Sequence, residues 1–136
     1  MFRRSMMALA AAVTVPMAAG SAAAQDTELG QALYRDHCAT CHGMAAEGDG
    51  PMTVVLKVPP PDLTRLAAAE GGTFPLERVV RRIDGRDEVL AHGGPMPVYG
   101  MILGGESGLI DAFDGTPVFT TQSVVDIAAW LRTIQR

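Results

Sequence analysis

Cys38-Ala39-Thr40-Cys41-His42 contains both cysteines of this 136-residue chain and places a histidine directly after the second. In an exported protein this C-x-x-C-H pattern is typical of a site where haem c is attached covalently. On a helical turn, three residues advance the chain by about 4.5 Å and rotate it by roughly 300°, so both thiols lie on one side. Cys38 and Cys41 can then form thioethers with the haem vinyl groups, and His42 can bind the iron as the proximal ligand.

Three other kinds of site use two cysteines at this spacing: a disulfide, a structural zinc site and a thioredoxin-like redox pair. A structural zinc site usually has four Cys or His ligands, and the chain adds only His37, His42 and His92, with no second C-x-x-C and no H-x-x-x-H. A redox C-x-x-C lies beside a strand of a βαβ unit, whereas residues 26–42 have the pattern of a helix and then a loop. The position of the histidine favours haem.

The first 24 residues have the design of a secretory signal peptide. Arg3 and Arg4 precede an apolar stretch over residues 6–19, and small residues end the segment at Ala22-Ala23-Ala24. This pattern predicts cleavage after Ala24, a mature chain of residues 25–136 and a periplasmic location. The alternative is an uncleaved membrane anchor, which the many alanines and the marginal length of the stretch disfavour.

Removal of the first 24 of the 136 residues leaves 112, the size of a single domain. Two of the 11 basic residues lie in the signal segment, so nine remain against 15 acidic residues, a net charge of about −6. This acidity argues against nucleic acid as a partner and favours a partner with a cationic docking surface.

Hydrophobic periodicity predicts helices at both ends of the mature chain. Residues 26–37 form the first, with Asp26 or Thr27 as its N-cap. The last helix has apolar residues at i, i+3, i+4 and i+7, namely Val124, Ile127, Ala128, Leu131 and Ile134. Ser123 and Asp126 are a plausible capping pair for it.

Gly30 lies inside the first predicted helix, where a glycine costs about 1 kcal/mol relative to alanine. Such a glycine indicates the close approach of another backbone. We expect the two terminal helices to cross with Gly30, Tyr34, Trp130 and Leu131 at the contact, the tryptophan filling the space that Gly30 leaves.

Two shorter helices are predicted between these ends. Residues 63–70 follow Asp62, a good N-cap, and residues 75–83 begin with a proline and end before Gly85. The second carries Arg78, Arg81 and Arg82, which form either a solvated face or a contact with haem propionates or a partner. Signals for β-strands are weak.

The sixth position of a haem iron bound by His42 requires a second ligand or stays open. Met96 lies between two prolines in Gly93-Gly94-Pro95-Met96-Pro97, and proline restricts the backbone on either side of the thioether. We therefore predict Met96 as the distal ligand. His92, Met101 and an open site are the alternatives.

The mature chain resembles the class I cytochromes c of the bacterial, periplasmic kind over residues 26–136. The resemblance rests on an ordered set of residues: Gly30 and Tyr34, the motif from Cys38 to His42, Gly43, Gly48-Asp49-Gly50-Pro51, Pro59-Pro60-Pro61-Asp62-Leu63-Thr64, Met96-Pro97, Tyr99-Gly100 and Trp130-Leu131.

This resemblance implies an all-α fold, with three main helices and one or two short ones around a single covalently bound haem c. It also implies His/Met coordination of the iron and electron transfer between a redox protein donor and acceptor. In the family a proline carbonyl accepts a hydrogen bond from the proximal imidazole. Pro51 matches this proline best, and Pro59, Pro60 and Pro61 are the alternatives.

The chain departs from compact members of the family in a longer connection over residues 101–120, interpreted as a lid, a docking surface or a packed loop, with the packed loop favoured. The function predicted from the sequence is that of a monomeric periplasmic electron carrier, neither an enzyme nor a binder of small-molecule substrates, with membrane association only if the signal stays uncleaved. The alternatives are a haem c subunit of a dehydrogenase or oxidase complex, and a haem sensor or catalytic protein with a displaceable sixth ligand.

Overall fold

The computed structural model describes residues 24–86 and 96–136. The predicted signal peptide, except its last residue Ala24, and His92 lie outside these ranges. Within them the chain is about half helical, with six α-helices, two 3₁₀-helices and one two-stranded sheet. No helix of the described ranges has both the length and the apolar character needed to cross a membrane.

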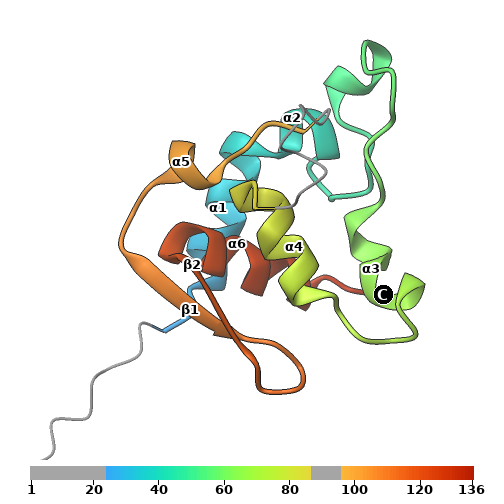
Figure 1. Ribbon diagram of the computed structural model, residues 1–136. Helices are drawn as coiled ribbons and strands as arrows, with labels where there is room; N and C mark the ends of the chain where they lie inside the picture. The colour runs from blue at the N-terminus through green and yellow to red at the C-terminus, as the bar shows by residue number, and fades with distance from the viewer. Residues whose placement is uncertain (1–23, 87–95) are drawn as a thin grey trace, which may run out of the picture.

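The two terminal helices are α1 (Thr27–His37) and α6 (Gln122–Thr133), and they cross at the centre of the molecule (Figure 1). The Asp26 side chain caps α1 by accepting from the backbone N–H groups of Glu28 and Leu29, which satisfies two donors that a helix start leaves unpaired. The sequence predicted both helices, and of its two candidate caps, Asp26 and Thr27, the structure has Asp26.

The crossing places helix backbones in direct contact. A Cβ on Gly30 would overlap the backbone carbonyl of Asp126, so the glycine is required by the close approach itself. Trp130 therefore does not fill the space beside Gly30. It packs against Tyr34 instead, with ring centroids 4.5 Å apart.

Asp126 does not form the predicted capping pair with Ser123. It is buried on α6, and its Oδ1 accepts from the backbone N–H of Asp26 at 3.0 Å and from Gln122 Nε2 at 2.8 Å. The N-cap of α6 is Thr121, which makes no capping bond through its side chain. The carboxylate thus fastens the start of α1 to α6.

The remaining helices lie around this pair. They are α2 (Ala39–His42), η1 (Pro51–Val54), η2 (Leu63–Arg65), α3 (Leu66–Ala69), α4 (Leu76–Asp84) and α5 (Gly100–Leu103). Asp62 caps η2 by accepting from Thr64 N–H, and Gly85 ends α4 in the left-handed conformation. Helix α4 buries Leu76, Val80 and Ile83 in the core.

The connection after Met96 contains a β-hairpin, which corrects the expectation of an all-α fold with a packed loop. Strands β1 (Ser107–Asp111) and β2 (Pro117–Thr121) pair antiparallel, with Ile110 opposite Val118. These two side chains are buried in the helical core, whereas Leu109 and Phe119 face outwards as a pair. Figure 1 shows the hairpin on one side of the molecule and η1 and α3 on the other.

Candidate haem-binding site

The C-x-x-C-H motif lies where α1 turns into α2. Cys38 ends α1, with its backbone N–H donating to the Tyr34 carbonyl at 2.8 Å, and it precedes the first residue of α2. The His42 N–H donates to the Cys38 carbonyl at 2.9 Å, so the motif forms one turn of helix. Cys38, Cys41 and His42 all line the same cavity, as the helical spacing predicts.

This cavity has a volume of about 460 Å³. Its walls come from segments far apart in the sequence and are mainly apolar: Leu56, Val58 and Pro59-Pro60-Pro61 on one side, Val79 and Ile83 of α4, and Ile127 and Leu131 of α6. An apolar, concave site of this kind suits a large flat cofactor whose body is hydrophobic.

Both thiols are free, with Cys38 buried and Cys41 partly buried. Burial, together with the neighbouring Cys41, raises the pKa of the Cys38 thiol to about 12. In residues 24–86 and 96–136 no three His, Cys, Asp or Glu side chains gather as a metal site. The two cysteines are thus available for bonds to another group.

His42 has a buried Nδ1 with no hydrogen-bond partner of suitable geometry. Burial lowers the pKa of the imidazole, and interaction with the backbone of Pro61 acts in the opposite direction. Since proline has no N–H, the group of Pro61 that acts on the ring is its carbonyl. If Nδ1–H is directed at the Pro61 carbonyl, Nε2 is the nitrogen that would bind an iron, because the hydrogen bond of one ring nitrogen decides which nitrogen is the metal ligand.

The structure favours Pro61 over Pro51 as the residue beside His42. Pro51 is exposed at the start of η1 and does not line the cavity, whereas Pro61 does. The reason lies in the loop after the motif, which is held against the later segment by the bond from Leu63 N–H to the Ala46 carbonyl at 2.8 Å. A Cβ on Gly48 would meet the Pro60 carbonyl at 2.5 Å, so this glycine lets the proline segment approach.

Met96 lines the same cavity as the motif and is partly buried. Met101, the alternative on α5, is 91% exposed and does not line it. The structure therefore brings Met96, rather than Met101, together with Cys38, Cys41 and His42. Ligation of iron by Met96 stays a prediction.

Tyr99 fixes the segment that carries Met96. Its N–H donates to the Ile83 carbonyl at 2.8 Å, and its hydroxyl donates to the His37 carbonyl at 2.8 Å. Its ring also meets the His37 ring edge-on, with centroids 6.2 Å apart. One residue thus ties the Met96 segment to the ends of α4 and α1, a role that the sequence pattern did not reveal.

The three arginines of α4 separate into two groups. Arg78 and Arg82 line the cavity, and Arg78 also forms an ion pair with Glu70 at 2.7 Å. Arg81 instead faces the hairpin and pairs with Glu77 at 3.6 Å. Because haem carries two propionate groups, the cations at this cavity suit its polar edge.

Taken together, the residues fit a haem. Two free thiols, the imidazole of His42 and a thioether line one apolar cavity with arginines among its walls. Thiols, imidazole and thioether are the groups that hold a haem c through its vinyl groups and its iron.

Comparison with known proteins gives one result. The family model described as "Cytochrome c" matches residues 27–135. Searches of the curated proteins and of the solved structures gave no significant match. The family model spans nearly the whole described chain, including the motif, the Met96 segment and both terminal helices. The chain therefore belongs to the cytochrome c family, which binds haem c covalently and serves haem-based electron transfer.

Proposed function

We propose that the protein is an exported carrier of single electrons, with one haem c held between His42 and Met96. The observation that carries this proposal is the cavity that both residues share with Cys38 and Cys41. Haem supplies the one-electron redox chemistry when it is bound. No residue acts as a nucleophile or general acid in this function, so the protein is a carrier and not an enzyme.

Each residue of the site has a distinct task. Cys38 and Cys41 would anchor the cofactor, and His42 would bind its iron with the imidazole oriented by the Pro61 carbonyl. The apolar walls limit access of water to the cavity, and a thioether from Met96 favours the reduced state. Together these features are expected to give a higher midpoint potential than ligation by two histidines would give.

The partners proposed are a redox protein donor and acceptor, met by a monomer in the periplasm. The location rests on the signal-like first 24 residues of the sequence. Exposed apolar side chains, Val54, Val55 and Val58, lie on the segment whose Val58 also lines the cavity. A partner that docks on this segment would approach the cofactor closely.

Substitution of the methionines tests the ligand assignment. Met96→Ala is expected to abolish the Met-to-iron charge-transfer band of the ferric protein and to lower its midpoint potential, because the thioether is lost. The control, Met101→Ala, removes an exposed side chain outside the cavity and is expected to change neither. The reverse pattern would move the ligand to Met101.

Two measurements separate the proposal from its alternatives. Ready binding of carbon monoxide to the reduced wild-type protein at neutral pH, with no charge-transfer band in the ferric form, would indicate a sensor or catalytic protein with an open site. Stable co-purification with a dehydrogenase or oxidase would indicate a subunit of a complex rather than a free carrier.

A further inference from the structure

The end of α4 is fastened to the hairpin by a nearly buried carboxylate. The Asp84 side chain is 8% exposed, and its Oδ2 accepts from Arg86 Nε at 2.7 Å and from the Thr120 hydroxyl at 3.0 Å. The Arg86 guanidinium also donates to the Phe119 carbonyl at 2.5 Å. Three side chains thus join the turn after α4 to strand β2.

The same turn holds the Met96 segment on its other side. Gly85 has φ of +82°, and a Cβ there would overlap Val98, so the valine packs directly on the turn. The Tyr99 N–H donates to the Ile83 carbonyl at 2.8 Å. A Cβ on Gly100 would lie 2.7 Å from the Asp84 carbonyl. Residues 83–85 therefore lie between β2 and the residues that directly follow Met96.

The hairpin is itself a firm support. Ile110 and Val118 are buried in the helical core, and the Gln122 N–H donates to the Glu106 carbonyl at 2.9 Å where the hairpin joins α6. A carboxylate as buried as that of Asp84 requires its bonding partners to stay in place, because an unpaired buried charge is costly. The contacts therefore fix the turn relative to β2.

We propose that Asp84, Arg86 and Thr120 form a clamp through which the hairpin holds Met96 in position to bind the haem iron. This inference rests on the proposed role of Met96 as sixth ligand. The three are positioning residues, since they act through Gly85, Val98 and the backbone that leads to Met96. When the clamp loosens, Met96 leaves the iron more readily and an external ligand takes its place more easily.

The test measures how readily cyanide replaces the sixth ligand in the ferric holoprotein. Thr120→Val removes the hydroxyl bond to Asp84 at nearly constant shape. We expect the apparent cyanide association constant to rise about three- to tenfold, the equivalent of one hydrogen bond. Thr120→Ser keeps the hydroxyl and is expected to retain the wild-type value.

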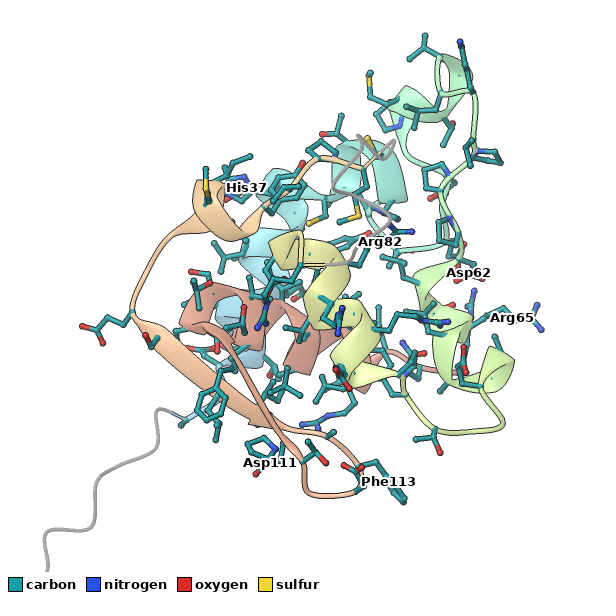
Figure 2. All side chains as sticks on the ribbon, in the orientation of Figure 1. His37, Asp62, Arg65, Arg82, Asp111 and Phe113 are labelled. Carbon is teal, nitrogen blue, oxygen red and sulfur yellow. The ribbon has the colours of Figure 1, made fainter. Side chains whose placement is uncertain are left out.

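Thr116→Val is the matched control. Thr116 lies in the hairpin turn, where its N–H donates to Asp114 Oδ1 at 2.9 Å, and it takes no part in the hydrogen bonds of the clamp. Figure 2 shows this end of the hairpin, marked by Phe113, on the side of the molecule away from α5. The control is expected to leave cyanide affinity unchanged, even where it lowers the melting temperature as much as Thr120→Val does.

Arg86→Ala gives a second route to the same result. Arg86 is about half exposed, so its removal is compatible with folding, yet it leaves Asp84 without its cation. We expect cyanide affinity to rise at least as much as in Thr120→Val, and Arg86→Lys to restore part of the wild-type value, because a lysine keeps the charge without the two-pronged geometry.

The outcomes distinguish the clamp from the ligand assignment. Met96→Ala is expected to raise cyanide affinity far more than any clamp variant. If it does so while Thr120→Val and Arg86→Ala match wild type, or match Thr116→Val, the clamp is refuted and the role of Met96 stands. If Met96→Ala leaves cyanide affinity unchanged, the sixth-ligand assignment and the clamp both fail.

Discussion

Tyr34 shows how a single residue ties a helix to the haem motif. Its hydroxyl donates to the Gly43 carbonyl at 2.8 Å, the side chain is 1% exposed, and burial raises its pKa, so the donor stays protonated. Tyr34→Phe deletes this bond but keeps the ring against Trp130. We expect the holoprotein to lose about 1 kcal/mol of unfolding free energy in denaturant titrations.

Tyr99→Phe is the natural comparison, since it also deletes a hydroxyl bond of 2.8 Å to a backbone carbonyl. Tyr99 is only partly buried, so water can replace the lost bond and the expected loss is smaller. An equal loss in the two variants would show that the burial of Tyr34 contributes nothing to the strength of its bond.

Among the site residues, the sequence predicts the positions of those that lie on one helical turn, but not of those that a loop brings together from distant parts of the chain. The positions of Cys38, Cys41 and His42 follow from one helical turn, so the sequence predicts them together. The residue beside the imidazole does not follow in this way. It depends on the loop with positive φ at Gly43, Ala46 and Gly48, against which the proline segment packs. This packing places Pro61, rather than Pro51, beside the ring.

The contact between α1 and α6 is the main junction between elements. Gly30→Ala would gain about 1 kcal/mol of helix propensity, but the added methyl would overlap the Asp126 carbonyl. Because a helix backbone cannot yield as a side chain does, we expect a net loss of about 2 kcal/mol or more in the unfolding free energy.

Ala32→Gly is the control for this prediction, at an exposed position of the same helix. It measures propensity alone and is expected to cost about 1 kcal/mol. If Gly30→Ala instead stabilised the protein, the two helices would not be in backbone contact in solution.

In the described ranges, the β-hairpin is the one type of element that the sequence analysis did not predict. Both terminal helices carry several apolar residues at helical spacing, whereas each strand has five residues and few that face the core. A signal was present, because Asp114-Gly115 stands between Leu109-Ile110 and Val118-Phe119, and Asp-Gly between apolar runs is typical of a hairpin turn. Because Leu109 and Phe119 are apolar but face outwards, the strands lack the alternation of apolar and polar residues that predicts a half-buried strand.

At the scale of the whole molecule, the C-terminus closes the fold around the loop that follows the motif. The Arg136 N–H donates to the Thr64 carbonyl at 2.9 Å, and its guanidinium pairs with Glu47 at 2.7 Å and lies 3.9 Å from Asp62. Gln135 Nε2 donates to the Leu63 carbonyl at 2.9 Å. The chain end thus holds η2, whose Leu63 lines the cavity, together with the loop that follows the motif.

Asp62 makes this closure sensitive to acid. Hydrogen bonds from the Thr64 hydroxyl and N–H, with Arg136 nearby, lower the pKa of the carboxyl below its usual value. A carboxyl with a lower pKa in the folded state stabilises the fold above its unfolded pKa of about 3.9 and loses this effect as the pH falls through its folded value. Asp62→Asn is therefore expected to lower the melting temperature of the holoprotein at pH 6, with a smaller difference from wild type at pH 3.

Asp36→Asn, on the exposed face of α1, controls for the removal of one negative charge from an acidic molecule. Melting temperatures of wild type and both variants, measured from pH 6 to pH 3, separate the two effects. A difference for Asp62→Asn that stays constant over this range, or that equals that of Asp36→Asn, would assign the effect to net charge. A difference that shrinks only for Asp62→Asn, and only as the pH falls below about 4, would place the acid sensitivity in the bonds that Asp62 accepts from Thr64 at the start of η2.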